Sequence, residues 1–283
     1  KLIIEVTPDI YNDKRFGINH KSISNNALNI ISRLQKSGFQ AYIVGGGIRD
    51  MIKGLKPKDF DIVTNCEPEE IRKIFRNSRI IGRRFKLVHI AFADEIIEAT
   101  TFRAGGTKTT ESIEINEKGR IVRDNNWGTQ EEDVLRRDLT INSIYYDPFS
   151  NEIIDYTKGI KDLKDKKIKF IGNSGERILE DPVRILRALR FAAKLNFTID
   201  QEIVKGIKEH GNQLLEMPPA RLYEEVIKMF MTGHAEQSFI QLKAYGVFDV
   251  LFPHFKDEDG IFDKFYLEAF RETDKRFKLN KKL

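Results

Sequence analysis

A glycine-rich turn between a strand and a helix constrains this chain more than any other feature. Residues 41–44 are apolar and β-rich, three consecutive glycines occupy 45–47, and residues 48–53 form a predicted short helix. Backbone without side chains at the start of a helix can cradle phosphate groups. A tight turn and a dinucleotide-binding fingerprint are the alternatives. The fingerprint fails because Asp50 occupies the position of its last glycine.

A pair of aspartates, Asp59 and Asp61, follows at the next predicted strand, 60–64. Residues two apart on a strand point to the same face, so the two carboxylates would lie side by side. Two adjacent anions repel and need a counter-charge, and oxygen ligands of this kind suit Mg²⁺. Taken alone, the preceding Lys-Pro-Lys favours a simple turn. The glycines ahead of the pair instead favour metal-dependent nucleotidyl transfer.

The pattern of predicted elements changes once along the chain. Residues 1–24 look like a polar N-terminal arm, and residues 25–172 mix helices with strands, including 86–93, 95–102 and a hairpin of 152–156 with 167–171. A single helix is expected over 131–143. From residue 173 to 283 the pattern is helical, clearest at 181–195, 201–210 and 221–231. We therefore predict an α+β fold: a head with a small mixed sheet, then an all-helical neck and body.

Composition narrows the function classes only slightly. The single cysteine, Cys66, excludes an intrachain disulfide and a Cys-based zinc cluster. No stretch approaches the roughly 18 apolar residues of a membrane span, and the start lacks the apolar core of a signal peptide, so we expect a soluble, cytoplasmic protein. The net charge of +5 permits a polyanionic partner without requiring one, and the basic residues in 271–283 are either a solvated end or an RNA-facing one.

Several motifs resemble those of one known family, in the family's order. This family is the class II branch of the polymerase-β-like superfamily, which contains the bacterial poly(A) polymerases and the CCA-adding tRNA nucleotidyltransferases. The matching segments are 44–50, 58–61, 98–103, 136–143, 155–163, 180–184 and 218–222. The resemblance implies that residues 25–172 are a nucleotidyltransferase head, and that residues 173–283 serve base recognition and RNA binding.

The resemblance also implies a third catalytic carboxylate, and Glu98 matches its position. Asp59 and Asp61 would bind the Mg²⁺ on the incoming triphosphate. Together with Glu98 they would hold a second Mg²⁺ that activates the RNA 3′-hydroxyl. In isolation, Glu98 would be better interpreted as a solvent-facing strand residue.

Nucleotide-binding residues are implied in the head by the same resemblance. The phosphate turn contributes Gly45, Gly46 and Arg49, while Arg137, Asp138 and Asn142 would line the ribose and phosphates. The carboxylate of Asp138 could accept a hydrogen bond from a 2′-hydroxyl and so favour ATP over dATP. Considered alone, the charges at 136–138 also fit an exposed, locally paired cluster.

The helical part has a motif that in this family reads the edge of the incoming base in place of a template. Asp181 and Arg184 match it, and Arg187 continues a stripe of arginines along the same helix. Pro182 at the first helical position offers a second interpretation, in which Asp181 only caps the helix.

The choice within the family depends on residues 80–90. Arg83 and Arg84 precede Phe85 there, as in the segment that marks poly(A) polymerases, and we expect both arginines to contact RNA; a solvated turn is the alternative. The prediction is a poly(A) polymerase that adds AMP from ATP to the 3′ ends of mRNA or other transcripts. A CCA-adding enzyme and a non-enzymatic RNA-binding protein of the same fold are the alternatives. An NAD-dependent oxidoreductase is opposed by the glycine spacing.

Overall fold

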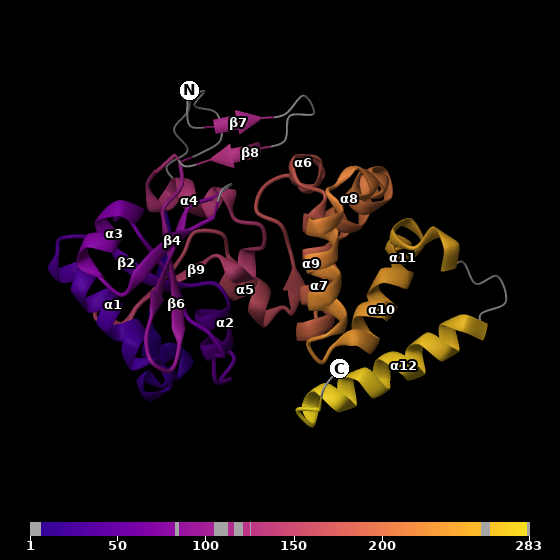
Figure 1. The fold of residues 1–283 in the computed structure, drawn as a ribbon, viewed down its shortest axis with the longest axis horizontal. Helices are drawn as coiled ribbons and strands as arrows, with labels where there is room; N and C mark the ends of the chain where they lie inside the picture. Colours follow the sequence, from indigo (N-terminus) through magenta and orange to yellow (C-terminus); the bar gives the residue numbers. More distant parts are fainter. Residues whose placement is uncertain are drawn as a thin grey trace. The chain divides into compact units, whose positions relative to one another are not determined.

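A computed structural model describes residues 7–82, 85–104, 113–115, 121–124, 126–255 and 261–281 (Figure 1). The chain divides into two compact units, Lys1–Leu163 and Lys164–Leu283. The first carries a mixed sheet and the second is mainly helical, which confirms the predicted α+β class. No helix in the ranges given above is both long and apolar enough to span a membrane.

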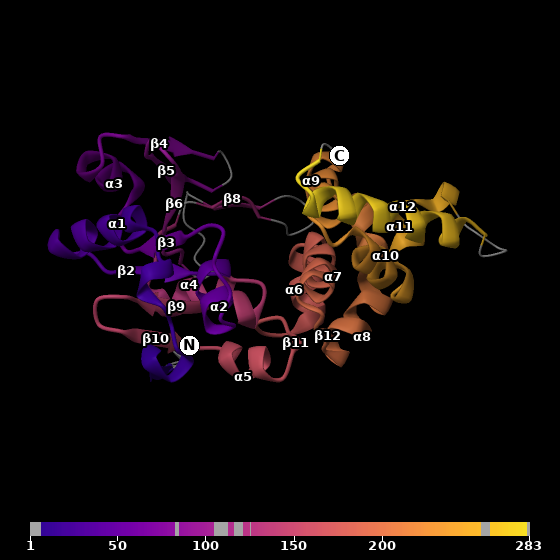
Figure 2. The same ribbon diagram turned by 90° about the horizontal axis from the view of Figure 1, so that it is seen from below.

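The first unit is built on a mixed sheet that has eight strands within the described residues, ordered β1-β10-β9-β2-β3-β6-β5-β4 (Figure 2). All neighbours are antiparallel except β3 and β6, which run parallel. A separate two-stranded sheet contains β7 and β8. The bounds are β1 Asp9–Asn12, β2 Ala41–Val44, β3 Asp61–Thr64, β4 Ser78–Ile81, β5 Leu87–Ala91, β6 Ile96–Thr101, β7 Ile113–Ile115, β8 Ile121–Asp124, β9 Ile144–Asp147 and β10 Glu152–Asp155.

The helices of this unit begin and end at recognisable sequence signals. Ser24 caps the first helix by accepting from two backbone N–H groups, and Thr129 with Glu132 forms a capping box at the fourth. The second helix begins at Gly46, inside the glycine run and ahead of the predicted start at 48. The bounds are α1 Asn25–Lys36, α2 Gly46–Ile52, α3 Pro68–Ile74, α4 Gln130–Arg136 and α5 Gly159–Lys164.

An aromatic cluster fills the core on one side of the sheet. Tyr145 is fully buried, and its ring meets those of Tyr42, Phe102 and Tyr156 at centroid distances of 6.1, 6.4 and 6.2 Å. Edge-to-face contacts at these distances stabilise beyond the area that they bury. Since Val134 of α4 belongs to the same cluster, this packing fixes α4 against β2, β3 and β9.

Three local predictions differ from the structure. The predicted hairpin of 152–156 with 167–171 is wrong: β10 pairs with β9 and β1, and β11 (Lys167–Ile168) pairs with β12 (Thr198–Ile199). Part of the expected arm, Asp9–Asn12, is strand β1 at the sheet edge. The expected helix 131–143 stops at Arg137, whose backbone is extended, and a 3₁₀ turn, Thr140–Asn142, follows.

Asp155 explains why the chain leaves the sheet after β10. Its buried carboxylate accepts hydrogen bonds from the backbone N–H groups of Thr157, Gly159 and Ile160, at 3.0, 2.9 and 2.9 Å. These bonds start helix α5 instead of a hairpin turn. Farther along α5, Asp162 accepts from the Thr140 hydroxyl at 2.7 Å, which ties the helix to the 3₁₀ turn.

The second unit is arranged around α7. This helix buries Ile185, Leu186 and Leu189 and packs against α9 and α10. The helices are α6 Ser174–Glu180, α7 Val183–Leu195, α8 Gln201–His210, α9 Pro219–Phe230, α10 Ala235–Ala244, α11 Val247–Leu251 and α12 Ile261–Lys278. The helix predicted at 201–210 is confirmed to the residue, and the pair β11–β12 is a small departure from an all-helical body.

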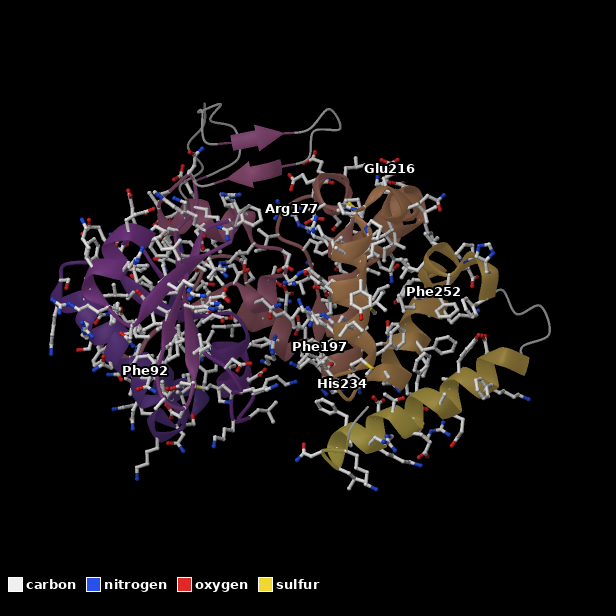
Figure 3. All side chains as sticks on the ribbon, viewed as in Figure 1. Phe92, Arg177, Phe197, Glu216, His234 and Phe252 are labelled. Atoms are coloured by element: carbon white, nitrogen blue, oxygen red, sulfur yellow. The ribbon has the colours of Figure 1, made fainter. Side chains whose placement is uncertain are left out.

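Aromatic side chains hold the last helices of this unit together. The ring of Phe239 on α10 lies 5.0 Å from that of Phe248 and 5.4 Å from that of Phe270 on α12. Phe248 in turn meets Phe252, labelled in Figure 3, at 5.1 Å. Phe248 of α11 also lies 6.2 Å from Tyr266 of α12, so the packing of α12 depends on ring contacts with both α10 and α11.

Gly159 offers a test of this arrangement. A Cβ there would lie 2.3 Å from the Thr140 carbonyl oxygen, a backbone atom that cannot step aside, so Gly159→Ala should lower the free energy of unfolding by about 1–3 kcal/mol. Chemical denaturation measures the change. The matched control is Gly211→Ala, where φ is −57° and the nearest atom would be 3.8 Å away, so stability should change by less than about 1 kcal/mol. Equal losses in both variants would contradict the steric argument.

Candidate active site

The turn between β2 and α2 lies directly against a carboxylate. Gly45 has φ 79° and ψ −133°, a backbone conformation that residues with a side chain rarely adopt. A Cβ at this position would stand 3.5 Å from Oδ2 of Asp61. The glycine therefore serves two purposes: it permits the turn, and it leaves open the space in front of the Asp61 carboxylate.

Asp59 is held by the packing of its neighbours. Pro57 and Phe60 are buried while Asp59 is exposed, so buried side chains fix the loop both before and after Asp59. A Cβ on Gly47 would come within 3.2 Å of the Asp59 carbonyl oxygen and 3.3 Å of the Phe60 ring. The first turn of α2 and this loop thus lie so close together that a side chain at 47 would require the loop to shift by a few tenths of an ångström.

The parallel pairing of β3 with β6 brings the third acid to the first two. Asp61 and Glu98 are register partners on these strands. The pKa of Asp61 is raised from 3.8 to about 6, first by desolvation, then by the charge of Glu98, and also by that of Asp59; Arg137 opposes the shift. Asp61 nevertheless stays accessible to solvent. Asp59, Asp61, Glu98 and Arg137 therefore form one electrostatically coupled group.

These carboxylates suit a hard divalent cation in chemical type. Their oxygens are the ligands that Mg²⁺ prefers, and the raised pKa of Asp61 marks negative charge that a cation would relieve. In the part of the chain that the structure describes, no three His, Cys, Asp or Glu side chains are arranged to hold a metal ion together. The two Mg²⁺ ions stay a prediction.

His89 joins the group from the neighbouring strand β5. It is the register partner of Glu98, and its Nε2 lies 3.8 Å from Glu98 Oε2. No functional role for His89 was predicted from the sequence. The alternation of residues 87–91 would place one side of β5 toward Glu98, but only once the pairing of β5 with β6 is known.

Arg137 is oriented by two residues that the sequence analysis also missed. Its Nε donates to Asp133 Oδ2 at 3.0 Å and to the Tyr145 hydroxyl at 3.2 Å, and Tyr145 donates to Asp133 at 2.9 Å. Burial disfavours the charged guanidinium, but Asp133 and Tyr145 outweigh it and raise the pKa of Arg137. The i,i+4 spacing of Asp133 and Arg137 was the available signal. Arg137 is thus a fixed cation beside the acids.

Arg49 and Asn142 form a buried pair. Nη1 of Arg49 donates to Asn142 Oδ1 at 2.7 Å and its Nε donates to Asp50 at 2.9 Å, while only 2% of Arg49 is exposed. The pair joins α2 to the 3₁₀ turn. Asp138 accepts from the Leu139 N–H at 2.7 Å just before that turn. Nucleotide contacts of Gly46, Arg49, Asp138 and Asn142 stay predictions.

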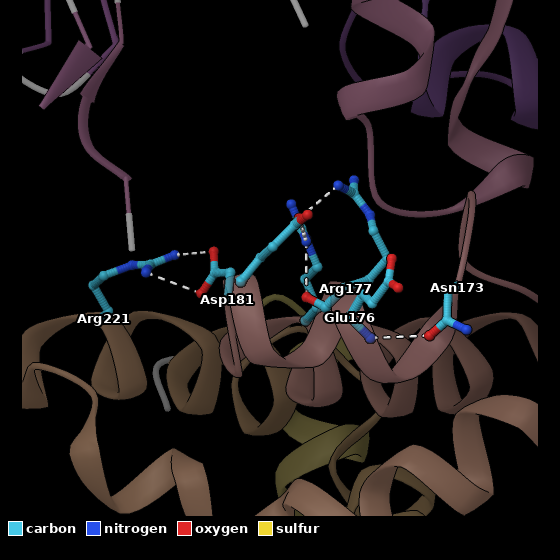
Figure 4. Close-up of polar contacts among 7 residues, drawn as sticks. Asn173, Glu176, Arg177, Asp181 and Arg221 are labelled. Atoms are coloured by element: carbon cyan, nitrogen blue, oxygen red, sulfur yellow. Dashed lines mark hydrogen bonds and ion pairs between the residues drawn. The ribbon is translucent and has the colours of Figure 1, made fainter. Parts of the chain in front are cut away.

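The second unit contains the other three predicted nucleotide-binding residues, of which Asp181 is labelled in Figure 4. Asp181 accepts two hydrogen bonds from Arg221, at 3.0 and 2.7 Å. Pro182, not Asp181, is the N-cap of α7, and no side chain caps it, so the capping interpretation is wrong. Arg184 bonds Glu180 at 2.7 Å, and Arg187 lies 3.5 Å from Glu225.

Arg83 and Arg84 lie outside the described residues. Phe85, which follows them, is described: the Arg103 guanidinium lies 4.1 Å from the centre of its ring, a cation–π contact. The predicted RNA contact of the two arginines stays a prediction.

Comparison with known proteins places these features in context. A family model described as "Poly A polymerase head domain" matches residues 41–169, and one described as "Probable RNA and SrmB- binding site of polymerase A" matches residues 196–259. Poly(A) polymerase I of Salmonella typhi is 43% identical over 273 residues, covering 94% of this chain and 59% of that protein. A CCA-adding enzyme of Streptococcus uberis is 34% identical over 246 residues, covering 84% of this chain and 58% of that protein.

Solved structures of CCA-adding enzymes are also similar to this chain. The Bacillus stearothermophilus CCA-adding enzyme in complex with CTP has a TM-score of 0.66 at 26% identity, covering 89% of this chain and 56% of that one. The Thermotoga maritima CCA-adding enzyme complexed with tRNA has a TM-score of 0.72 at 20% identity, covering 97% and 63%, and is similar in fold. The chain therefore spans about three fifths of the length of its curated relatives.

The unfavourable negative charge of Asp61 should make the folding stability of the protein depend on pH. Because its pKa is raised, the folded state is penalised once the group ionises: the penalty is absent below about pH 3.8 and complete above about pH 6. Asp61→Asn should therefore be more stable than the parent protein at pH 8, by about 1 kcal/mol after discounting for solvent exposure, and should lose this advantage at pH 4. Thermal unfolding at the two pH values measures it. An advantage that is equal at both pH values would contradict the coupling of the three acids.

Proposed function

This chain belongs to the family of bacterial poly(A) polymerases and CCA-adding nucleotidyltransferases, and we propose that it adds AMP from ATP to RNA 3′ ends without a template. The observation that carries the proposal is the group formed by Asp59, Asp61 and Glu98 in front of the Gly45 turn. The poly(A) polymerase relatives are 43% identical, against 34% for the CCA-adding enzyme, which favours AMP tailing.

The three acids would hold two Mg²⁺ ions in this proposal. When bound, the ions supply positive charge to the triphosphate and favour ionisation of the attacking hydroxyl. The RNA 3′-oxygen forms a bond to the α-phosphorus, the bond from that phosphorus to the β-phosphate oxygen breaks, and pyrophosphate leaves. The role of the protein is to position the reactants and to provide charge where charge develops.

Residues around the acids would bind the phosphates and the ribose of the nucleotide. The backbone of Gly45 and Gly46 would receive phosphate oxygens, and Arg137, fixed by Asp133, would stabilise the leaving pyrophosphate. Arg49, buried against Asn142, would keep the 3₁₀ turn in place so that Asn142 and Asp138 face the ribose. Asp138 would favour ATP over dATP by accepting from the 2′-hydroxyl.

The second unit would choose the base and bind the RNA. Asp181 and Arg184 would read the edge of the adenine, while Arg187 and, in the head, Arg83 and Arg84 would contact nucleotide or RNA phosphates. The name Poly(A) polymerase I and the description "Probable RNA and SrmB- binding site of polymerase A" support RNA as the substrate. Within this proposal the RNA is mRNA or another transcript, and the location is the cytoplasm. CCA addition is the alternative, favoured by the CCA-adding enzymes among the sequence relatives and the solved structures.

One assay separates the two activities. The purified chain is incubated with Mg²⁺ and either an unstructured RNA with ATP, or a tRNA lacking its 3′ end with CTP and ATP. We expect long AMP tails on the first substrate. Addition that stops after three nucleotides on the second substrate would instead establish CCA addition, and no transfer to either would refute the proposal.

Removal of one carboxylate should abolish transfer. Asp59→Ala is expected to lower the rate at least about 10³-fold, because the ligands of both ions lose an oxygen, while RNA affinity changes less than about twofold. Primer extension measures the rate, and a filter-binding assay measures the affinity. Glu70→Ala is the matched control, since Glu70 is an exposed acid of the same unit paired with Lys73. Substantial transfer by Asp59→Ala would remove this residue from the reaction.

A further inference from the structure

Helix α9 carries two oppositely charged residues one turn apart, Arg221 and Glu225, and both contact the segment that includes α7. We propose that Arg221 is a positioning residue for base selection, which holds Asp181 as a fixed hydrogen-bond acceptor and so makes the site prefer adenine and cytosine, the bases with an amino group at C6 or C4. The inference rests on the proposed function, since it assumes that Asp181 meets the incoming base.

The geometry of the Arg221–Asp181 pair is specific. Nη1 and Nη2 of Arg221 each bond a different oxygen of the carboxylate, at 3.0 and 2.7 Å (Figure 4). This two-point contact fixes the plane of the carboxylate as well as its position. With 33% of the Arg221 side chain and 19% of the Asp181 side chain exposed, the pair is partly shielded from water but still reachable by a ligand.

Asp181 keeps the ability to bind a ligand in this arrangement. A carboxylate oxygen has two lone pairs, and Arg221 uses one on each oxygen, so each can accept one more hydrogen bond. An ionised carboxylate has no proton to donate. Asp181 is therefore an acceptor only, with a fixed direction.

An acceptor of fixed direction discriminates between bases by their exocyclic groups. Adenine at C6 and cytosine at C4 present an amino group, which donates, whereas guanine at C6 and uracil at C4 present a carbonyl oxygen, which accepts. A carboxylate facing a carbonyl oxygen leaves both groups without a donor, and such unpaired contacts are strongly disfavoured. If Asp181 were free to rotate, it could turn away from a wrong base.

Glu225, one turn after Arg221 on α9, makes a second contact between α9 and α7. Only 5% of Glu225 is exposed, and its carboxylate lies 2.9 Å from Arg190 Nε and 3.5 Å from Arg187 Nη1. Arg221 and Glu225 thus join α9 to the region of α7 by two ion pairs of opposite sense. Sliding of one helix against the other would break both ion pairs, so α9 holds the Arg221–Asp181 pair in a fixed position.

The test compares four nucleotides in variants of Arg221. Equilibrium binding of ATP, CTP, GTP and UTP is measured by calorimetry alongside kcat/KM for transfer. In Arg221→Gln the preference for ATP over GTP should fall roughly tenfold, with the largest loss in ATP affinity. Arg221→Lys, which keeps the charge but lacks the planar fork, should show a smaller loss and serves if the Gln variant does not fold. Arg271→Gln is the control, an arginine of the same unit paired with Glu236 and Glu268.

A charge swap distinguishes positioning from simple stabilisation. The double variant Asp181→Arg with Arg221→Asp should recover the unfolding temperature lost in Arg221→Gln but not the preference for ATP. Recovery of that preference, or an Arg221→Gln variant that weakens all four nucleotides equally, would overturn the inference. An inactive parent protein would refute the proposed transfer alone, since the binding preferences would still decide the role of Arg221.

Discussion

The head depends on one constraint: two acidic residues, Asp61 and Glu98, are neighbours on paired strands. Because β3 and β6 run parallel and in register, Asp61 has Glu98 as its neighbour on the next strand. Desolvation, followed by the charge of Glu98, raises the pKa of Asp61 to about 6. The sheet can hold this pair because the residues next to it on the two strands, Ile62, Val63 and Ala99, are apolar and buried. Stability from the core offsets repulsion at the strand end, and that repulsion is what would favour binding of a cation.

The same physical device appears in both units: a buried carboxylate fixes an arginine. In the head Asp133, 6% exposed, orients Arg137; in the helical unit Glu225, 5% exposed, holds Arg190. An arginine held in this way loses little side-chain freedom when an anion binds, which improves binding. This explains why acidic side chains lie beside arginines in both units of a protein whose proposed ligands are themselves anionic.

Local signals in the chain were sufficient for a large part of the fold. The strand at 41–44 and the helix at 201–210 are found at the predicted residues, since apolar periodicity and flanking turn residues act within a few positions. The hairpin predicted from 152–156 is wrong because Asp155 accepts from three N–H groups that follow it. The helix predicted over 131–143 ends at Arg137, and directly after it the side chain of Asp138 accepts from the Leu139 N–H, in place of a helix carbonyl. Both errors arise from side chains that compete with regular backbone hydrogen bonding.

The sequence by itself determined the glycine turn, the spacing of Asp59 and Asp61, and the order of the motifs, because these depend on residues near one another in the chain. Only the tertiary structure decided that β6 pairs with β3 and β5, which sets Glu98 beside Asp61 and His89, and that Asp181 pairs with Arg221 and does not cap its helix. The physical reason is the same in each case. The partner of a strand edge or of a charged side chain is selected by packing between distant segments, and a local pattern carries no record of that choice.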